Sequence, residues 1–328
     1  MPILLAASRI STLQATTRCE MAFYCNADEV RARAIRDCFS RELPDLRFVA
    51  AGEPFEPEEV QYILTWKVIP ELRERYRKLE VVFSLGAGVD QLRFEELPQQ
   101  AKLVRLIEPG IIALMQEYVV MATLALHRDL PIYLGQRAEA EWIKHPIRPA
   151  FGVRVGVMGL GQLGQAVLRA LAPFGFELAG WSRTPRAMEG VSSFAGDKEL
   201  APFLARTDIL ICLLPLTNAT HGILSRTLLA QLPMGAGLVH VGRGQHLDQD
   251  ALLEALGSGQ LRGAVLDVTD PEPLPKGHAI WNHPRILLTP HIASTAQTDT
   301  AALAIVENIR RHSRGEDMIG EVKRDRGY

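Results

Sequence analysis

The sequence has few cysteines, little net charge and no long apolar run, and each shortage excludes a class of protein. Its four cysteines, Cys19, Cys25, Cys38 and Cys212, show no CxxC or other ligand-like spacing. We therefore expect reduced thiols in a cytoplasmic protein, and no metal site. The net charge is −2, with acids and bases spread along the chain, so neither nucleic acid nor a membrane surface is expected as a partner. No stretch approaches the ~20 apolar residues that span a bilayer.

What the chain contains is an ordinary globular composition, with 47% hydrophobic and 23% charged residues over 328 positions. This length allows two domains, each with a core of its own. Residues 1–20 include Arg9, Arg18 and several hydroxyl residues, with no acid before Glu20. That composition also fits a transit peptide. Because Met21 directly precedes the first apolar segment, we favour a disordered N-terminal extension.

Short apolar segments alternate with helix-like runs from Met21 onward, which predicts parallel sheets covered by helices on both faces. In the first half, a helix-like run spans 27–40, and strands are expected at 21–25, 46–50, 61–65, 81–85 and 103–107. A longer helix at 113–130 follows, with Met115, Val119, Ala122 and Leu126 on one face. Residues 131–151 hold several prolines and glycines and predict an irregular connection.

A second alternating series occupies the rest of the chain. Strands are expected at 153–158, 176–181, 208–214, 237–241, 263–268 and 285–289. Helices are expected near 162–172, 198–205, 225–231, 248–257 and 295–312. No internal repeat is visible, which excludes solenoid architectures.

A glycine-rich turn follows the first strand of this second series. Gly159, Gly161 and Gly164 form a GxGxxG pattern between an expected strand and an expected helix. There the first glycine allows a tight turn, the second lets the main chain approach a pyrophosphate, and the third lets helix and strand pack closely. The helix N-terminus offers N–H groups to the phosphates. We expect dinucleotide binding here, with Gln162 and Leu163 included; a structural turn is the alternative.

The end of the next strand favours NADPH over NADH. An NAD site expects an acid ~20 residues after the glycine turn, on the ribose 2′-hydroxyl. The residues found there are Ser182, Arg183 and Thr184, with no acid. Arg183 could pair with a 2′-phosphate, and the two hydroxyls could add hydrogen bonds. The alternative is an ordinary solvated loop arginine.

Three further polar residues, Arg243, Glu272 and His291, each come shortly after an expected strand. Ligands of doubly wound sheets usually bind at that edge. Taken singly, each has a plain explanation: a surface arginine, a solvated carboxylate or a capping histidine. His240 and His246 flank the arginine; we assign them no role and expect solvent-facing or helix-start positions.

Together the three residues form a chemically complete set for reducing a 2-oxo acid. A guanidinium matches carboxylate geometry and can polarise the ketone, which suits Arg243. Imidazoles titrate near neutral pH, which makes His291 the candidate proton donor. Glu272 could favour the protonated imidazole and fix its tautomer. The hydride would come from the nicotinamide.

These segments resemble the D-isomer-specific 2-hydroxyacid dehydrogenase family, and most of all its glyoxylate/hydroxypyruvate reductase branch. The resemblance runs from Met21 to Tyr328. The motifs that carry it are LGAGVD at 85–90, GLGQLG at 159–164, WSRT at 181–184, LLPLT at 213–217, GRG at 242–244, LDVTDPEPLP at 266–275, TPHIAS at 289–294 and the closing RDRGY.

The resemblance implies a role for each matching residue. It assigns substrate binding to Arg243, support of the histidine to Glu272 and acid–base chemistry to His291. It also places Asp267 at the nicotinamide carboxamide and Pro215 near the nicotinamide.

The resemblance further assigns the 85–90 loop to substrate. Gly86, Ala87 and Gly88 expose main-chain N–H groups that could hold a carboxylate, although a structural turn is the competing interpretation. Trp66 resembles an aromatic residue that closes the pocket, although a lone tryptophan is more often simply core.

The expected fold is therefore α/β, with two doubly wound, Rossmann-like parallel-sheet domains and a cleft between them. By resemblance, residues 109–291 form the NAD(P)-binding domain and residues 21–108 plus 292–328 the substrate domain. The cleft would close over substrate and exclude water. Related homodimers suggest that the helix at 113–130 packs on a second subunit; an internal core face is the alternative.

The expected function is NADPH-dependent reduction of glyoxylate or hydroxypyruvate to the D-2-hydroxy acid. Two alternatives stay open at this point. One is another 2-hydroxyacid specificity, such as phosphoglycerate, lactate or a bulkier 2-oxo acid. The other is a non-catalytic dinucleotide sensor similar to the family's transcriptional corepressors.

Overall fold

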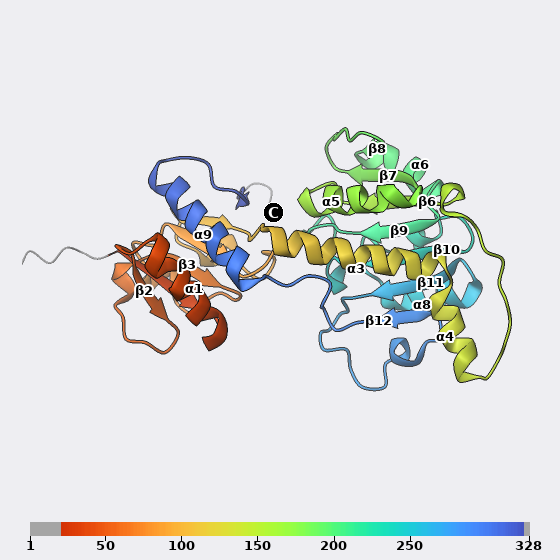
Figure 1. The fold of residues 1–328 in the computed structure, drawn as a ribbon, viewed down its shortest axis with the longest axis horizontal. Coiled ribbons are helices and arrows are strands. Elements are labelled where there is room, and N and C mark those ends of the chain that lie inside the picture. Colours follow the sequence, from red (N-terminus) through yellow and green to blue (C-terminus); the bar gives the residue numbers. More distant parts are fainter. Residues whose placement is uncertain (1–20, 325–328) are drawn as a thin grey trace, which may run out of the picture.

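The computed structural model describes residues 21–324 and has two sheets, each covered by helices, at opposite ends of the molecule (Figure 1). The N-terminal extension expected over residues 1–20 lies outside the described residues. The first sheet has the strand order β13-β5-β4-β3-β1-β2. Its strands are β1 (Ala22–Asn26), β2 (Arg47–Ala50), β3 (Val60–Thr65), β4 (Val81–Ser84), β5 (Lys102–Val104) and β13 (Glu321–Val322).

The second sheet has the order β12-β11-β10-β9-β6-β7-β8, and all its described pairings are parallel. Its strands are β6 (Arg154–Met158), β7 (Glu177–Ser182), β8 (Ser192–Ala195), β9 (Ile209–Cys212), β10 (Ala236–His240), β11 (Leu261–Leu266) and β12 (Ile286–Leu288). The strand order reverses between β6 and β9. The carboxyl ends of strands at such a reversal are where doubly wound folds bind ligands.

The helices cover both faces of these sheets. They are α1 (Glu29–Glu42), α2 (Leu72–Arg75), α3 (Pro109–His127), α4 (Leu130–Ala138), α5 (Gln162–Leu171), α6 (Leu200–Ala205), α7 (Arg226–Leu229), α8 (Gln249–Ser258) and α9 (Thr298–Ser313). Together the sheets and helices confirm the expected α/β fold with two doubly wound sheets.

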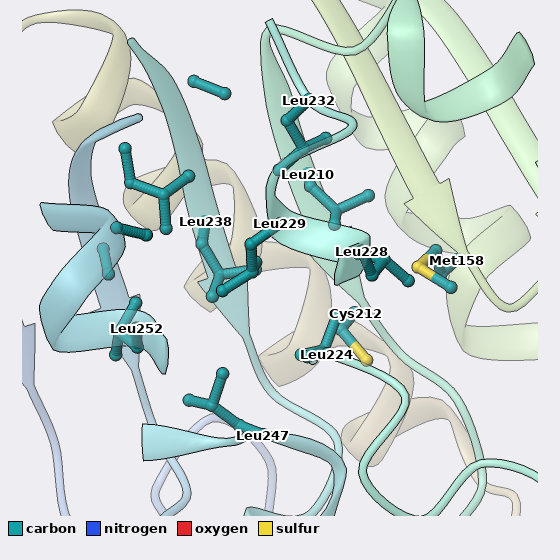
Figure 2. Close-up of a cluster of buried hydrophobic side chains, with 14 of the residues drawn as sticks. Met158, Leu210, Cys212, Leu224, Leu228, Leu229, Leu232, Leu238, Leu247 and Leu252 are labelled. Carbon is teal, nitrogen blue, oxygen red and sulfur yellow. The ribbon is translucent and has the colours of Figure 1, made fainter. Parts of the chain in front are cut away.

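Alternate residues of the second-sheet strands enter two separate cores. Leu210 and Leu238 pack with Leu228 and Leu252 of α7 and α8 on one face (Figure 2). Their neighbours along the strands, such as Ile211, belong to the other core, together with α3 and α5. Because both faces are buried, these strands are apolar throughout instead of alternating with polar residues.

Helix α3 connects the two sheets and confirms the expected apolar face. Met115, Val119, Ala122 and Leu126 are at most 8% exposed and pack in the core of the second sheet. By length and composition alone α3 could cross a membrane, contrary to the expectation that no segment could. Of its most apolar 18-residue stretch, 44% is buried inside the molecule, and the core helices of soluble proteins can have the same length and composition.

Three local differences from the expected elements have simple causes. Residues 131–151 are not wholly irregular, because α4 occupies Leu130–Ala138 with Pro131 in its first turn, where proline is favoured. Strand β8 is short and lies at a sheet edge, with a weak apolar pattern. The two-residue β13 pairs antiparallel with β5, so the first sheet is not entirely parallel.

Glu108 ties together the two places where the chain crosses between the sheets. Its carboxylate accepts hydrogen bonds from the N–H groups of Gly110 and Ile111, at the start of α3. It also accepts from the N–H of Gln297 at 3.2 Å and from the hydroxyl of Thr300, at the start of α9. The side chain is buried, so one carboxylate caps the start of α3 and ties it to the start of α9.

We therefore expect Glu108→Ala to lower the free energy of unfolding by about 2–4 kcal/mol, since four donors lose a buried acceptor. Urea denaturation measures the change. Glu117→Ala, at an exposed position on the same helix, is the control and should change stability by less than ~0.5 kcal/mol. Equal effects of the two substitutions would contradict the capping role.

Candidate active site

A cavity of about 690 Å³ lies between the loops of the two sheets. Nearly all the residues that the sequence predicts for the site line it. They are Trp66, Gly86, Ala87 and Gly88 from the first sheet, and Gly159, Gly161, Gln162, Leu163, Gly164, Ser182, Arg183, Thr184, Pro215, Arg243, Asp267 and His291 from the second. Glu272 is not on the wall and lies behind His291.

The glycine turn has the geometry expected of a dinucleotide loop. Gly159 has φ +108°, and a Cβ there would lie 2.7 Å from the carbonyl oxygen of Leu213. A Cβ on Gly164 would collide with the carbonyl of Gly159, so close packing of α5 on β6 requires glycine. Gly161 faces open space, and no side chain caps the start of α5. The free N–H groups of that helix start can therefore meet a pyrophosphate.

The segment after β7 forms the next part of the wall. Ser182 is buried, and its hydroxyl donates to the carbonyl of Thr184 at 2.8 Å, which shapes the turn. Arg183 and Arg186 are exposed and line the cavity. Asp197, in the segment after β8, also lines the cavity, although the sequence did not indicate it as a site residue.

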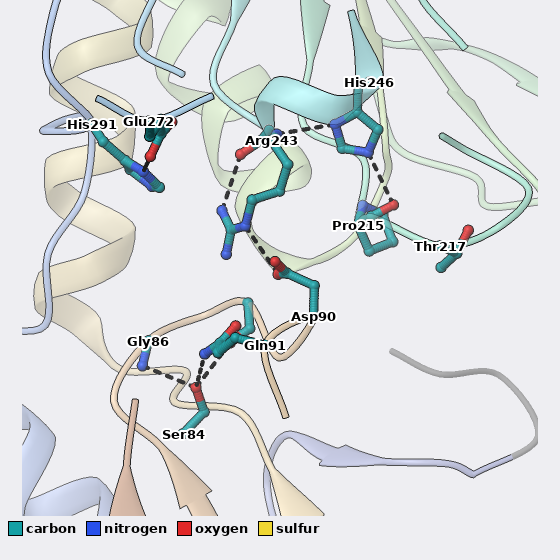
Figure 3. Close-up of polar contacts among 12 residues, drawn as sticks. Ser84, Gly86, Asp90, Gln91, Pro215, Thr217, Arg243, His246, Glu272 and His291 are labelled. Carbon is teal, nitrogen blue, oxygen red and sulfur yellow. Dashed lines mark hydrogen bonds and ion pairs between the residues drawn. The ribbon is translucent and has the colours of Figure 1, made fainter. Parts of the chain in front are cut away.

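Arg243 extends from the loop after β10 toward the first sheet (Figure 3). Its Nε donates to Oδ1 of Asp90 at 2.9 Å, and both side chains are largely buried. A Cβ on Gly88 would collide with the guanidinium, so the glycine admits the arginine beside the 85–90 loop. Asp90 was not among the predicted site residues, although it ends the LGAGVD motif. An arginine here can bind an anion in a region shielded from water.

Ser84 stabilises the 85–90 loop through two hydrogen bonds. Its hydroxyl donates to the carbonyl of Gly88 at 2.8 Å and accepts from the N–H of Gly86 at 3.3 Å (Figure 3). Trp66 is 40% exposed and packs its ring over Gly86, where a Cβ would lie 2.8 Å from the ring. The tryptophan therefore forms part of the cavity wall, and it is not a simple core residue.

His291 and Glu272 form a direct pair, with Nδ1 of the imidazole 2.8 Å from Oε2 of the carboxylate (Figure 3). His291 has φ +55°, in the left-handed region that residues other than glycine rarely adopt. Such strain persists only where surrounding contacts hold it. The Glu272 contact leaves Nε2 of the imidazole as the nitrogen that can serve a ligand in the cavity.

Asp267 holds the strained loop in place. Its Oδ1 accepts from the hydroxyl of Thr289 at 2.6 Å and from the N–H of Ile292 at 2.8 Å, and its Oδ2 accepts from the N–H of Ala293 at 2.8 Å. Its main-chain carbonyl accepts from the N–H of His291. The sequence did not indicate this function, because the contacts join the loop after β11 to the loop after β12.

His240 and His246 do not face solvent, since both are fully buried; His246 does lie in a short helical turn, Gly244–His246, whereas His240 ends β10. Their rings contact the main chain of Arg243. Burial lowers the pKa of both side chains, to about 3 for His240, so both are neutral near neutral pH. Strand β10 carries His240 into the core, where Nε2 has the carbonyl of Arg243 as a partner and Nδ1 has none among the described residues, whereas both nitrogens of His246 have partners.

The described cysteines, Cys25, Cys38 and Cys212, are free and buried. Burial raises the pKa of the Cys25 and Cys212 thiols to about 12, so they remain protonated. Cys212 lies beside His240 and His246, with the possible ligand atoms of the three residues within 4.8 Å of one another. The sequence gave no sign of this cluster.

Comparison with known proteins gives a consistent result. Residues 120–293 match the model of the D-isomer specific 2-hydroxyacid dehydrogenase NAD-binding domain. A glyoxylate/hydroxypyruvate reductase A from Klebsiella pneumoniae (strain 342) is 40% identical over 294 residues, which cover 88% of this chain and 94% of that relative.

Two solved structures are similar over almost the whole chain. A D-isomer specific 2-hydroxyacid dehydrogenase from Xanthobacter autotrophicus Py2, in complex with NADPH and MES, has a TM-score of 0.89 and 40% identity, covering 94% of this chain and 100% of that one. An NADPH-dependent glyoxylate/hydroxypyruvate reductase from Sinorhizobium meliloti, in complex with NADP and sulfate, has a TM-score of 0.85 and 33% identity, with the same coverage. The chain is therefore an enzyme of the D-isomer specific 2-hydroxyacid dehydrogenase family, in its glyoxylate/hydroxypyruvate reductase branch.

Proposed function

We propose that the protein uses NADPH to reduce small 2-oxo acids, glyoxylate and hydroxypyruvate, to D-2-hydroxy acids. The observation that carries the proposal is that Arg243 and His291, the latter paired with Glu272, line the same cavity as the glycine turn. Relatives with these activities in their names are about 40% identical to the chain. Bound in this cavity, NADPH supplies the hydride, and the protein supplies position, charge and a proton.

Arg243 binds the substrate carboxylate in this proposal. Its guanidinium stays charged, and two of its nitrogens can face both oxygens of a carboxylate. The main-chain N–H groups of Ala87 and Gly88 add hydrogen bonds from the opposite side of the cavity, and Gly86, whose N–H donates to the hydroxyl of Ser84, shapes the loop that presents them. Asp90 accepts from Nε and the carbonyl of Gly242 accepts from Nη1, which leaves Nη2 and the second hydrogen of Nη1 for the substrate. This arrangement fixes the carbonyl carbon relative to the cofactor loop.

His291 donates the proton to the oxygen that becomes the hydroxyl. Glu272 binds Nδ1 and so orients Nε2 toward the cavity. Developing negative charge on the substrate oxygen is stabilised by the imidazolium and by the nearby guanidinium. Asp267 contributes by holding the loop that carries His291, and it also remains our candidate for contact with the nicotinamide carboxamide, near Pro215.

Arg183 selects NADPH over NADH. It lines the cavity where the adenosine ribose would lie, at the end of β7, and no acid occupies positions 182–186. A guanidinium can pair with a 2′-phosphate, while an acid at the same place would repel it. Thr184 and Ser182 complete the turn that presents the arginine.

The enzyme acts as a homodimer in the cytoplasm in our proposal. Residues 141–149 have no regular secondary structure and run along the outside of the second sheet (Figure 1). Trp142 is 93% exposed, Ile147 73% and Phe151 74%. A second copy of the chain is the natural cover for such an apolar arm. We further propose 109–291 as the cofactor domain and 21–108 plus 292–328 as the substrate domain.

The first test is turnover itself, followed as NADPH absorbance at 340 nm after adding glyoxylate or hydroxypyruvate. His291→Ala should lower kcat by ~10²–10⁴-fold, because the proton donor is lost, while the Kd of NADPH stays unchanged. Glu272→Gln should lower kcat less, since the amide keeps a hydrogen bond but not the charge.

His221→Ala, at an exposed position that does not line the cavity, is the matched control and should retain full activity. Activity only with bulky 2-oxo acids would keep the mechanism and overturn the substrate. Tight NADPH binding without any turnover would overturn the proposed reaction.

Arg183→Ala should raise the KM of NADPH by ~10–100-fold, because a charge-assisted pair with the 2′-phosphate is lost. The KM of NADH should change by less than ~3-fold. Arg169→Ala, on the exposed side of α5 and outside the cavity, is the control for a general loss of positive charge. An equal loss with both cofactors would show that Arg183 does not read the 2′-phosphate.

Sedimentation should show the wild-type protein at twice the mass of the 36.3 kDa chain. Trp142→Asp should shift it toward the monomer, because a charge in an apolar interface is costly. Met234→Asp, at a side chain 75% exposed elsewhere on the surface, should leave the mass unchanged. A dimer that tolerates Trp142→Asp would place the interface away from this arm.

A further inference from the structure

The main chain of Arg243 is held between two buried imidazoles that the reaction scheme does not use. The N–H of Arg243 donates to Nδ1 of His246 at 3.0 Å. The carbonyl oxygen of Arg243 accepts from Nε2 of His240 at 2.9 Å. The residue that would bind the substrate carboxylate thus has both polar groups of its main chain bound to a histidine.

The chemistry of these contacts fixes the proton on each ring. A main-chain N–H can only donate, so Nδ1 of His246 carries no proton and Nε2 carries it (Figure 3). That Nε2–H faces the carbonyl oxygen of Pro215 at 3.3 Å, in the loop proposed to lie near the nicotinamide. A carbonyl can only accept, so the proton of His240 is on Nε2, toward Arg243. Both rings are therefore neutral and donate in one direction only.

Packing around the rings leaves the arginine loop almost no freedom. A Cβ on Gly242 would lie 2.8 Å from Nδ1 of His246. A Cβ on Gly244 would collide with the carbonyl of Thr269. Both imidazoles are fully buried. The loop therefore fits against His246 on one side and Thr269 on the other.

The same geometry speaks against a metal ion held by Cys212, His240 and His246. A ligating imidazole needs a free lone pair on the nitrogen that faces the metal. The lone pair of His246 is used by the N–H of Arg243, and its other nitrogen carries a proton toward Pro215. Of the four ring nitrogens of His240 and His246, Nδ1 of His240 is the one without a partner among the described residues. One free imidazole nitrogen and one thiol offer two ligands, fewer than the three or four protein ligands of zinc sites.

We propose that His246 and His240 are positioning residues that hold the main chain of Arg243, so that its guanidinium meets the substrate carboxylate. This inference rests on the proposed carboxylate-binding role of Arg243. His246 contributes more, because it also links the arginine loop to the Pro215 loop. Because the main chain is already fixed, the arginine loop loses less conformational entropy when the guanidinium binds substrate.

Two isosteres separate the contacts of His246. The Oδ1 of asparagine lies where Nδ1 of histidine lies, so His246→Asn keeps the acceptor for the N–H of Arg243. The amide nitrogen of glutamine lies where Nε2 lies, so His246→Gln keeps the donor to Pro215 and loses that acceptor. Pro215 also accepts from the hydroxyl of Thr220 at 2.7 Å, so it keeps a partner in either variant.

We expect His246→Gln to raise the KM of glyoxylate, and the Kd of the unreactive analogue oxamate with the NADPH complex, by ~10-fold. The kcat should change by less than ~3-fold, and the Kd of NADPH should not change. His246→Asn should restore both constants to within ~3-fold of wild type. This rescue by the shorter side chain separates positioning from a general loss of packing.

Two variants of His240 give an independent test if the His246 variants do not fold. His240→Gln keeps a donor near the carbonyl of Arg243, whereas His240→Leu removes it. The leucine variant should show the larger rise in the KM of glyoxylate at equal Kd for NADPH. Thermal unfolding of each variant reports whether the fold is retained.

If the wild-type protein is active but His246→Asn and His246→Gln have the same KM for glyoxylate and the same Kd for oxamate, the positioning role is overturned and the proposed function is not. A wild-type protein that neither reduces 2-oxo acids nor binds oxamate would instead overturn the proposed function on which it rests. Stoichiometric zinc in the purified protein, lost on Cys212→Ser, would replace the positioning role by a metal site.

Discussion

Parallel pairing of β9, β10, β11 and β12 is the constraint on which the active site depends. The register aligns His240 with Cys212 and with Leu266, and Leu266 with Leu288. The next residues along each strand therefore leave the sheet at one edge, which brings the Pro215 loop, Arg243, Asp267 and His291 to a common cavity. These strands are mainly apolar and most of their residues are buried, so the polar residues of the site occur where the strands end.

Around this edge, buried polar side chains hold the loops in their positions. Asp267 accepts from the His291 loop, and Glu272 accepts from the imidazole itself. His246 and His240 bind the arginine loop. These contacts offset the cost of the left-handed conformation at His291 and of burying polar rings, so the reactive groups are fixed before a ligand arrives.

The Asp90–Arg243 ion pair connects the loops of the two sheets. A substrate carboxylate would share the guanidinium with Asp90, so binding couples the substrate to both halves of the cavity at once. Glu108 caps α3 and binds the N–H of Gln297 just before α9, where the chain crosses between the sheets. The two crossings are thus linked through one residue, and the cavity lies between the loops of the two sheets.

The sequence by itself determined the α/β class, most strands of both sheets and the glycine turn, and it predicted Arg243, Glu272 and His291 as site residues, because these depend on local patterns of apolar, glycine and polar residues. It gave no sign of β8 or β13, it failed at α4, where prolines suggested a loop, and it failed on the burial of His240 and His246, although the helix-start position was correct for His246. Only the tertiary structure decided the partners of Asp90, Asp267 and Glu108, and the burial of the two histidines. Those outcomes depend on which strands become neighbours, and hydrogen bonds between residues far apart in the chain leave no periodic trace in the sequence.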